Sequence, residues 1–240
     1  MELCEKDASR AWAINVDSTK TLATWASEHD AKFVCVSTDS VFDGTRGNYR
    51  ESDEPAPVNV YARTKLAAED AVRSRCPNAL IVRTNFFGWS RGRSAGLAEW
   101  MLTRLINGER FGGFTDVRFD PLFTEGLAHI ILELIRHDAR GVFHAGTQDS
   151  CSKYEFAIAL ANVFRLDASL IHPISVDKSP LVARRPKNTS LATEKISAFL
   201  GREMPSVSKQ VHALRSAMPL GNYLAGDAGA DKLVRPNAAM

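Results

Sequence analysis

The sequence predicts an α/β protein with a Rossmann-like, doubly wound parallel sheet and a smaller C-terminal substrate-binding part. Two short apolar, β-branched runs, residues 32–36 and 79–82, each end in polar residues, which is typical of buried parallel strands. Between them, apolar residues recur at helical spacing over residues 60–75. A strand, a helix and a second strand in this order form one βαβ unit, the building block of α/β folds.

The other elements continue this alternation. Residues 11–26 have a helical pattern, with Trp12, Val16, Leu22 and Ala23 available for one buried face. Ser152 is a suitable N-cap for the amphipathic helix that follows it in the sequence. The pattern predicts further helices at residues 97–106, 124–135 and 154–164, and a further strand at residues 141–144.

Three parts are expected along the chain. Residues 1–148 are predicted to form a truncated Rossmann-like dinucleotide-binding domain, and residues 149–218 a substrate-binding part. Residues 219–240 have little to bury, so we expect a disordered tail.

Composition favours small-molecule chemistry. The net charge is only +2, from 30 basic and 28 acidic residues, and no basic stripe indicates binding of nucleic acid or of a membrane surface. The sequence has no basic segment followed by an apolar run at its start, and no run of about 18 apolar residues, so we expect a cytoplasmic protein. The four cysteines form no C-x-x-C pair, so no metal site is predicted, and His144 is expected in the core.

Polar residues follow the first predicted strand at Ser37 and Thr38. In an open α/β sheet, ligands bind at the carboxyl ends of the strands, so these two hydroxyls are expected to face the crevice. The alternative is that the Ser-Thr-Asp segment simply begins a turn, as such residues often do.

A second candidate group is Tyr61 with Lys65. Their four-residue spacing places the phenol and the ammonium on one face of a helix, one turn apart. A nearby positive charge lowers the pKa of a phenol from about 10, which makes tyrosine a usable general acid. The alternative for this pair is an exposed helix surface.

Together these segments resemble a known family. The run from Ser37 to Gly44, then Tyr49, Tyr61 and the stretch from Lys65 to Glu69 resemble the extended short-chain dehydrogenase/reductases, and within them the dTDP-4-dehydrorhamnose reductase (RmlD-like) family. The stretches at residues 80–85 and 183–191 agree with the same family.

The resemblance implies a catalytic role for three residues. Thr38, with Ser37 beside it, would bind the substrate carbonyl, and Tyr61 would deliver a proton to that oxygen. Lys65 would lower the pKa of Tyr61 and contact the nicotinamide ribose, so that Ser37, Tyr61 and Lys65 also bind the cofactor, NADP or NAD.

Five further residues are assigned by the same resemblance. Asn15 would support the active-site backbone and the cofactor, with a plain helix-surface residue as the alternative, and Thr84 would also contact the cofactor. Asn85 would contact the substrate, and Arg184 and Arg185 would clamp the diphosphate of a nucleotide sugar, because guanidinium groups match phosphate oxygens. A solvated basic loop is the alternative for the two arginines.

The sequence departs from the family pattern in its glycine residues. Neither G-x-G-x-x-G nor G-x-x-G-x-x-G occurs, although a glycine-rich turn after the first strand normally approaches the cofactor pyrophosphate. By comparison with the family pattern, we expect that two βα units, on the order of 60 to 70 residues, are missing ahead of Met1. Their absence is expected to expose an apolar edge of the sheet.

The expected function is an NAD(P)H-dependent reductase of a nucleotide-linked 4-keto-6-deoxy sugar, with a homodimer as a further prediction. Ser40 and Asn85 stand where rhamnose-forming relatives carry aromatic residues, so the sequence does not identify the substrate sugar. One alternative is an epimerase or dehydratase with the same residues. Another is a non-catalytic homologue, because relatives of this reductase include a regulatory subunit that binds an enzyme of S-adenosylmethionine synthesis.

Overall fold

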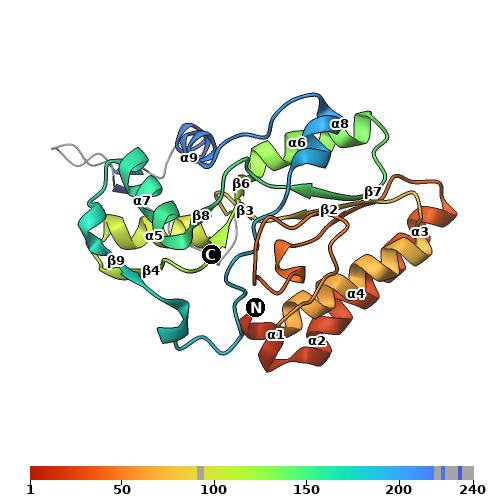
Figure 1. Cartoon of the computed structure of the whole chain (residues 1–240), viewed down its shortest axis with the longest axis horizontal. Coiled ribbons are helices and arrows are strands. Elements are labelled where there is room, and N and C mark those ends of the chain that lie inside the picture. The colour runs from red at the N-terminus through yellow and green to blue at the C-terminus, as the bar shows by residue number, and fades with distance from the viewer. Residues whose placement is uncertain (91–94, 219–222, 225–231, 234–240) are drawn as a thin grey trace, which may run out of the picture.

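A three-stranded parallel sheet lies at the centre of the protein. The computed structural model describes residues 1–90, 95–218, 223–224 and 232–233. The sheet has the order β1-β2-β7, formed by Val34–Val36, Leu80–Thr84 and Gly141–Ala145. Helices lie on both faces of this sheet (Figure 1), so the predicted α/β class is confirmed.

The side chains of β2 alternate between two cores. Ile81 packs with Ala23 and Val72 on one face, whereas Leu80 and Val82 pack on the other, as expected where a strand is covered on both sides. The first face is covered by α3 (Ser18–Glu28) and α4 (Val60–Arg75), and the second by α6 (Thr124–Arg136) and α8 (Glu194–Leu200).

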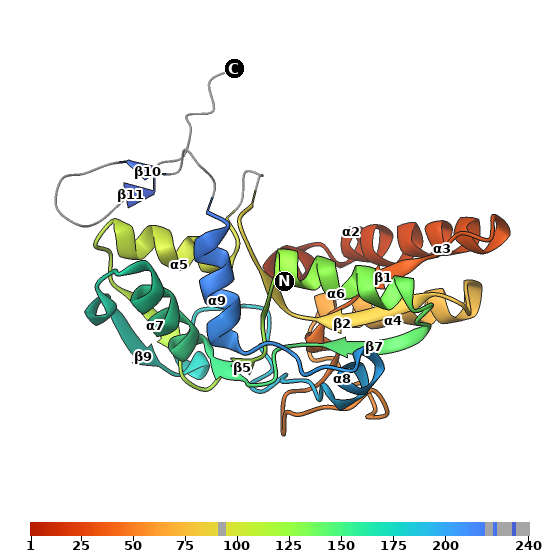
Figure 2. The same cartoon turned by 90° about the horizontal axis from the view of Figure 1, so that it is seen from above.

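A second hydrophobic cluster lies beside the sheet (Figure 2). It contains α5 (Leu97–Ile106), α7 (Lys153–Phe164), α9 (Val207–Ser216) and the parallel pair of β4 (Phe111–Phe114) with β9 (Ile171–Ile174). Ser152 caps α7 as predicted, because its side chain accepts the Glu155 N–H and the Glu155 carboxylate accepts the Ser152 N–H. This cluster takes residues from both sides of position 148, and the domain boundary itself stays a prediction.

Short elements complete the described chain. They are α1 (Glu2–Lys6), α2 (Ala8–Trp12), η1 (Ala13–Asp17), η2 (Asp39–Val41), β3 (Phe86–Phe87), β5 (Arg118–Phe119), β6 (Leu122–Phe123), β8 (Cys151–Ser152), η3 (Ala168–Leu170), η4 (Val176–Lys178), β10 (Tyr223–Leu224) and β11 (Lys232–Leu233). Apart from β10 and β11, the predicted tail at residues 219–240 lies outside the described residues. Within the described ranges, no helix is both long and apolar enough to span a bilayer.

The predicted helix at residues 11–26 is confirmed, but its predicted buried face is partly wrong. Ala23 is fully buried, whereas Trp12 is 43% and Leu22 is 58% exposed. The helical run from α2 to α3 contains the π-helical segment η1, whose wider turn rotates the residues that follow relative to an α-helical pattern. In addition, β1 pairs only with β2 among the described strands, and Val36 is exposed at its outer edge.

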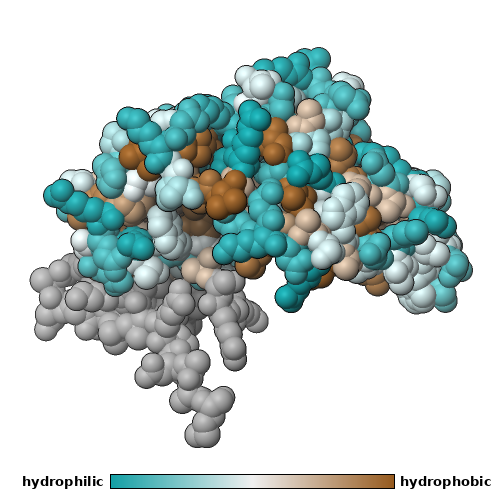
Figure 3. Space-filling view, turned by 90° about the horizontal axis from the view of Figure 1, so that it is seen from below, coloured by the Kyte–Doolittle hydropathy of each residue, from teal (hydrophilic) through white to brown (hydrophobic). Residues whose placement is uncertain are grey.

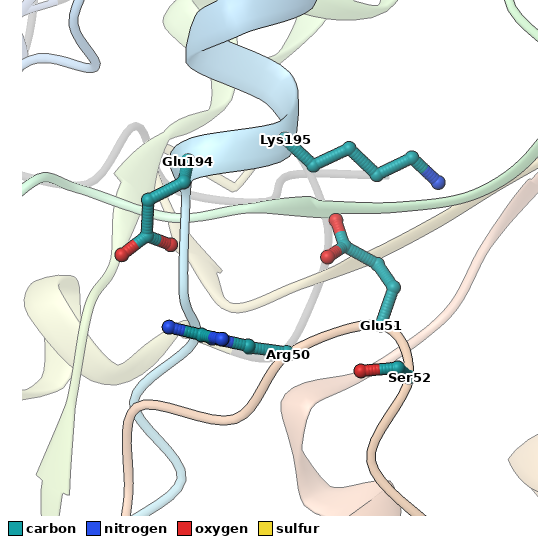
Figure 4. A pocket seen from close by; sticks show the side chains of 5 residues that line it. All are labelled: Arg50, Glu51, Ser52, Glu194 and Lys195. Atoms are coloured by element: carbon teal, nitrogen blue, oxygen red, sulfur yellow. The ribbon is translucent and has the colours of Figure 1, made fainter.

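Side chains cover the outer edge of β7 (Figure 4). Glu51 accepts a hydrogen bond from the His144 N–H at 2.9 Å, and the Lys195 Nζ donates to the Val142 carbonyl at 2.5 Å. These two side chains line an open cavity of about 640 Å³ together with Arg50, Ser52 and Glu194. These side chains bond to backbone groups of β7 on the side of the strand that faces no neighbouring strand within the described ranges. The cavity therefore lies among the side chains that cover this edge of the sheet. His144 is fully buried, as predicted.

Candidate active site

Helix α4 carries the tyrosine and the lysine of the predicted site. Its N-cap is Asn59, whose Oδ1 accepts the Ala62 N–H at 2.9 Å. The Glu5 carboxylate of α1 accepts the Val60 N–H at 2.7 Å. Two side chains therefore satisfy the first N–H groups of the helix and fix the turn that holds Tyr61.

The Tyr61 hydroxyl lies next to Thr38. Tyr61 is half-buried, and the Thr38 side chain is close enough to shift the pKa of the phenol, so the structure brings these two predicted residues together. Burial raises the pKa of Tyr61 above its usual value. The interaction with Thr38 lowers this pKa, whereas electrostatic interactions with Asp39 and Cys4 raise it further. The phenol is therefore protonated at neutral pH and is available as a proton donor.

The Lys65 ammonium contacts the outer edge of β1. Its Nζ donates to the carbonyl of Val36, at 2.7 Å. Burial dominates the pKa of the Tyr61 phenol, and the lowering of that pKa by Lys65 stays a prediction. Lys65 does lie one turn after Tyr61 on α4, as predicted.

Asn15 reaches the active-site helix. Its Nδ2 donates to the Thr64 Oγ1 at 2.9 Å, and the Thr64 hydroxyl in turn donates to the Tyr61 carbonyl at 2.8 Å. Asn15 lies in the π-helical segment η1, a feature that is frequent at functional sites. The alternative of a plain helix-surface residue is therefore not what the structure shows.

Asp39 gathers the polar side chains beneath Tyr61. This carboxylate is 1% exposed and accepts hydrogen bonds from four side chains. Oδ1 accepts from the hydroxyls of Thr38 and Ser40, both at 3.1 Å. Oδ2 accepts from Asn85 at 3.0 Å and from Thr189 at 2.7 Å, so Asp39 joins the ends of β1 and β2 to the segment after the basic loop.

Ser37 faces a buried ion pair. Its hydroxyl donates to the Glu69 Oε1 at 2.5 Å, and the Arg83 guanidinium donates to both oxygens of Glu69, with the shortest distance 2.8 Å. Glu69 and Arg83 are at most 2% exposed. The structure therefore uses the Ser37 hydroxyl to fix the end of β1, beside Thr38.

The two arginines of the basic loop differ in their surroundings. Arg185 is half-buried and its Nη2 donates to the Glu2 carboxylate at 2.8 Å. The Arg184 side chain is exposed, while its carbonyl accepts from the Asn59 Nδ2 at 2.9 Å. The loop is thus attached to the N-cap of α4, close to Tyr61.

Thr84 is 2% exposed and follows Arg83 at the end of β2. Its nearest hydrogen-bond partner is the Asn85 carbonyl at 3.4 Å, which is a weak contact. The structure thus places Thr84 beneath the same sheet end as Asn85.

Lys153 and Asp120 were not predicted as site residues. The Lys153 ammonium lies over the Phe119 ring, and burial lowers its pKa to about 7, although the Asp39 and Asp120 carboxylates oppose that shift. Burial raises the pKa of Asp120 well above its usual value, and its Oδ1 has no hydrogen-bond partner among the described residues. Asp120 and Lys153, which both interact electrostatically with Asp39, add two titratable groups near the site.

The residues present fit only one end of a nicotinamide dinucleotide. Asn15 and Lys65 are held on or against the helix that carries Tyr61, and their contact with a nicotinamide ribose stays a prediction, while no glycine-rich turn for the pyrophosphate occurs in this sequence. Within the described ranges, no three His, Cys, Asp or Glu side chains are grouped so that they could hold a metal ion.

The fold and the site define an extended short-chain dehydrogenase/reductase. The family model described as "RmlD substrate binding domain" matches residues 1–218, and the chain belongs to this family.

Named relatives fall into two groups. A Haloferax volcanii protein, "Probable low-salt glycan biosynthesis reductase", is 33% identical over 218 residues, covering 89% of this chain and 73% of the relative. The dTDP-4-keto-6-deoxy-D-glucose reductase of Streptomyces niveus is 32% identical, and the match covers 91% of this chain and 75% of that relative. The methionine adenosyltransferase 2 subunit beta of Pongo abelii is 31% identical over 85% of this chain, which spans only 63% of that relative.

A solved structure supports the fold. The dTDP-4-dehydrorhamnose reductase of Bacillus anthracis, in complex with NADP, superimposes with a TM-score of 0.83 at 27% identity, over 90% of this chain and 76% of that chain.

Sequence reasoning missed several residues of the site. Asp39 lies inside the predicted Ser-Thr-Asp segment, and Glu69 follows Tyr61 and Lys65 at four-residue intervals on one helix face, so both carried a local signal. Glu2 and Lys153 carried none, because they reach the site from distant parts of the chain.

Proposed function

We propose that this protein is an NAD(P)H-dependent reductase of a nucleotide-linked 4-keto-6-deoxy sugar. The observation that carries this proposal is the contact between Thr38 and a protonated Tyr61 at the carboxyl end of the sheet. The named reductases among the relatives support the same reaction class.

In this proposal, each residue has a limited task. Thr38 donates a hydrogen bond to the substrate carbonyl, which orients it and polarises it. Tyr61 transfers its proton to that oxygen, as a general acid. Asn15 and Lys65 hold the ribose side of the site, where a bound NADPH or NADH supplies the hydride. Asn85, Arg184 and Arg185 bind the substrate.

The test is the Tyr61→Phe variant, with dTDP-linked 4-keto-6-deoxy sugar and NADPH. Loss of the general acid is expected to reduce turnover about 10²- to 10⁴-fold, while substrate binding is retained. NADPH oxidation followed by absorbance measures the change. Undiminished turnover in this variant would remove Tyr61 from the mechanism, and turnover without net NADPH consumption would favour an epimerase or dehydratase.

A second candidate is a non-catalytic, partner-binding role. One observation favours it: the Lys65 ammonium donates to the Val36 carbonyl. One of the relatives is named as a subunit of methionine adenosyltransferase 2. Co-purification of a stable partner with both the wild type and a Tyr61→Phe, Lys65→Met double variant, without turnover in either, would favour this role.

A further inference from the structure

The Glu2 carboxylate of α1 lies in a set of donors formed by residues 182–185. Its Oε2 accepts the N–H groups of Val182 at 3.1 Å and of Ala183 at 3.3 Å. Its Oε1 accepts from the Arg185 Nη2 at 2.8 Å. We call these two N–H groups and the guanidinium the anion cradle. Consecutive N–H groups and a guanidinium are also the donors that proteins use for phosphate oxygens.

Ala183 and Arg185 of the anion cradle also line a cavity of about 480 Å³. Its charged lining residues are Arg184, Arg185 and Lys187 together with the carboxylates of Asp43 and Asp177. Lys187 is paired with Asp116 and Asp177, whereas the Arg184 side chain has no partner within the described ranges. Arg184 is therefore a cation on this lining that can pair with an anionic ligand.

The position of the cradle relative to Tyr61 is fixed by hydrogen bonds. The Asn59 Nδ2 donates to the Arg184 carbonyl at 2.9 Å, and Asn59 is the N-cap of the helix whose second residue is Tyr61. An anion bound in the cradle therefore lies near the residue that would donate the proton. A sugar joined to a diphosphate has this arrangement of a negative group next to a reacting carbonyl.

Little structure opposes the departure of Glu2. Helix α1 is five residues long and buries none of them, and the Glu2 side chain is 34% exposed. Burial raises the pKa of Glu2, but the N–H groups of Ala183 and Val182 and the charge of Arg185 outweigh this, so its pKa is lowered overall. Glu2 is therefore a charged carboxylate at neutral pH, held at the surface by displaceable contacts.

We propose that Glu2 is an internal competitor of the substrate diphosphate, and that it occupies the anion cradle in the free protein. The proposal rests on the proposed function, because it takes a nucleotide sugar as the ligand. Nucleotide binding then requires Glu2 to leave, so the apparent affinity is reduced by the fraction of molecules whose cradle is free.

Calorimetric titration with dTDP, and with inorganic pyrophosphate as a probe of the cradle alone, tests this at neutral pH and fixed salt. Glu2→Gln keeps the size of the side chain and removes its charge, so both probes should bind about tenfold more tightly. Glu28→Gln, which changes an exposed carboxylate at the end of α3 and outside the cradle, should leave the affinity unchanged. Adding Arg185→Gln to Glu2→Gln should abolish the gain.

Unchanged or weaker binding of both probes to Glu2→Gln would overturn the proposal, since Glu2 would then position Arg185 and not compete. A gain that survives Arg185→Gln would also overturn it, because the anion would bind elsewhere. Absence of binding to every variant is a third contradiction. The titrations need no turnover, so the two proposals can fail separately. Tighter binding to Glu2→Gln without reductase activity would refute only the proposed function. Reductase activity with unchanged affinity would refute only the competition by Glu2.

Discussion

The Tyr61 phenol is set up as an acid and not as a phenolate. Burial raises its pKa, and the ammonium one turn away donates to the Val36 carbonyl. A group whose pKa is raised keeps its proton through the neutral range and loses it only above its usual value of about 10. A protonated phenol is the state that the proposed proton donation to a carbonyl oxygen requires.

This gives a prediction for the pH profile. If Tyr61 is the proton donor, kcat/KM should not fall on the alkaline side until the pH exceeds about 10, because the acid form persists to that point. Initial rates of NADPH oxidation between pH 7 and 10.5 measure this. A descending limb near pH 8 that Tyr61→Phe abolishes would show that Lys65 does lower the pKa of the phenol.

The buried pair of Glu69 and Arg83 gives a prediction for stability. Glu69→Gln leaves the Arg83 guanidinium without its carboxylate, and breaking a buried pair in this way costs about 3–5 kcal/mol. Arg73→Gln is the matched control, because Arg73 pairs with the same carboxylate but is 42% exposed, and it should cost less than about 1 kcal/mol. Urea unfolding followed by circular dichroism gives both values, and equal losses would contradict the account.

At the scale of elements, local periodicity predicted most helices closely. The pattern over residues 60–75 corresponds to α4, and those at 97–106 and 124–135 to α5 and α6. Periodicity did not reveal the π-helical segment before α3, because the expected repeat assumes 3.6 residues per turn. Nor could periodicity show that Leu22 faces outward, because the exposure of this side chain depends on which elements pack against α3.

The orientation of α3 can be tested with two neighbouring substitutions. Leu22→Gln changes an exposed side chain and should alter the free energy of unfolding by no more than about 0.5 kcal/mol. Ala23→Gln forces a larger polar group into a fully buried position and should cost about 1–3 kcal/mol. Chemical denaturation compares the two, and a larger loss for Leu22→Gln would mean that α3 packs with its other face.

At the scale of the whole molecule, the segment after the basic loop is attached to the polar segment that follows β1. Thr189 donates to Asp39, and Leu191 forms an isolated bridge with Tyr49 before the chain enters α8. These partners are more than 100 residues apart in sequence, so no local pattern encodes them. The proximity of Thr38 and Tyr61 could be predicted because both residues belong to one βαβ unit, whereas the contacts of Glu2, Lys153 and Thr189 arise only from the tertiary fold.

His144 makes the stability of the whole fold depend on pH. Burial lowers its pKa from 6.5 to about 3, and the nearby Arg83 charge acts in the same direction. In the unfolded chain the imidazole takes up a proton near pH 6.5, so its contribution is present above that pH and is lost as the pH falls toward 3.

The expected slope is up to about 1.4 kcal/mol per pH unit in that range. His144→Gln removes the titrating group, so the variant should lose stability less steeply than the wild type between pH 6.5 and 4. Urea midpoints at half-unit pH intervals measure the difference. Parallel curves for the two proteins would show that His144 is not the group that resists protonation in the fold.

The central claim is that the Thr38–Tyr61 pair serves reduction of a sugar carbonyl. Incubation with NADPH deuterated at the transferred position and a dTDP-linked 4-keto-6-deoxy sugar tests it most directly, with product analysis by mass spectrometry. The account predicts one deuterium at C4 of the product with wild-type protein, and at least a hundredfold slower incorporation with Tyr61→Phe. Product that forms without deuterium, or equal incorporation by both proteins, would contradict it.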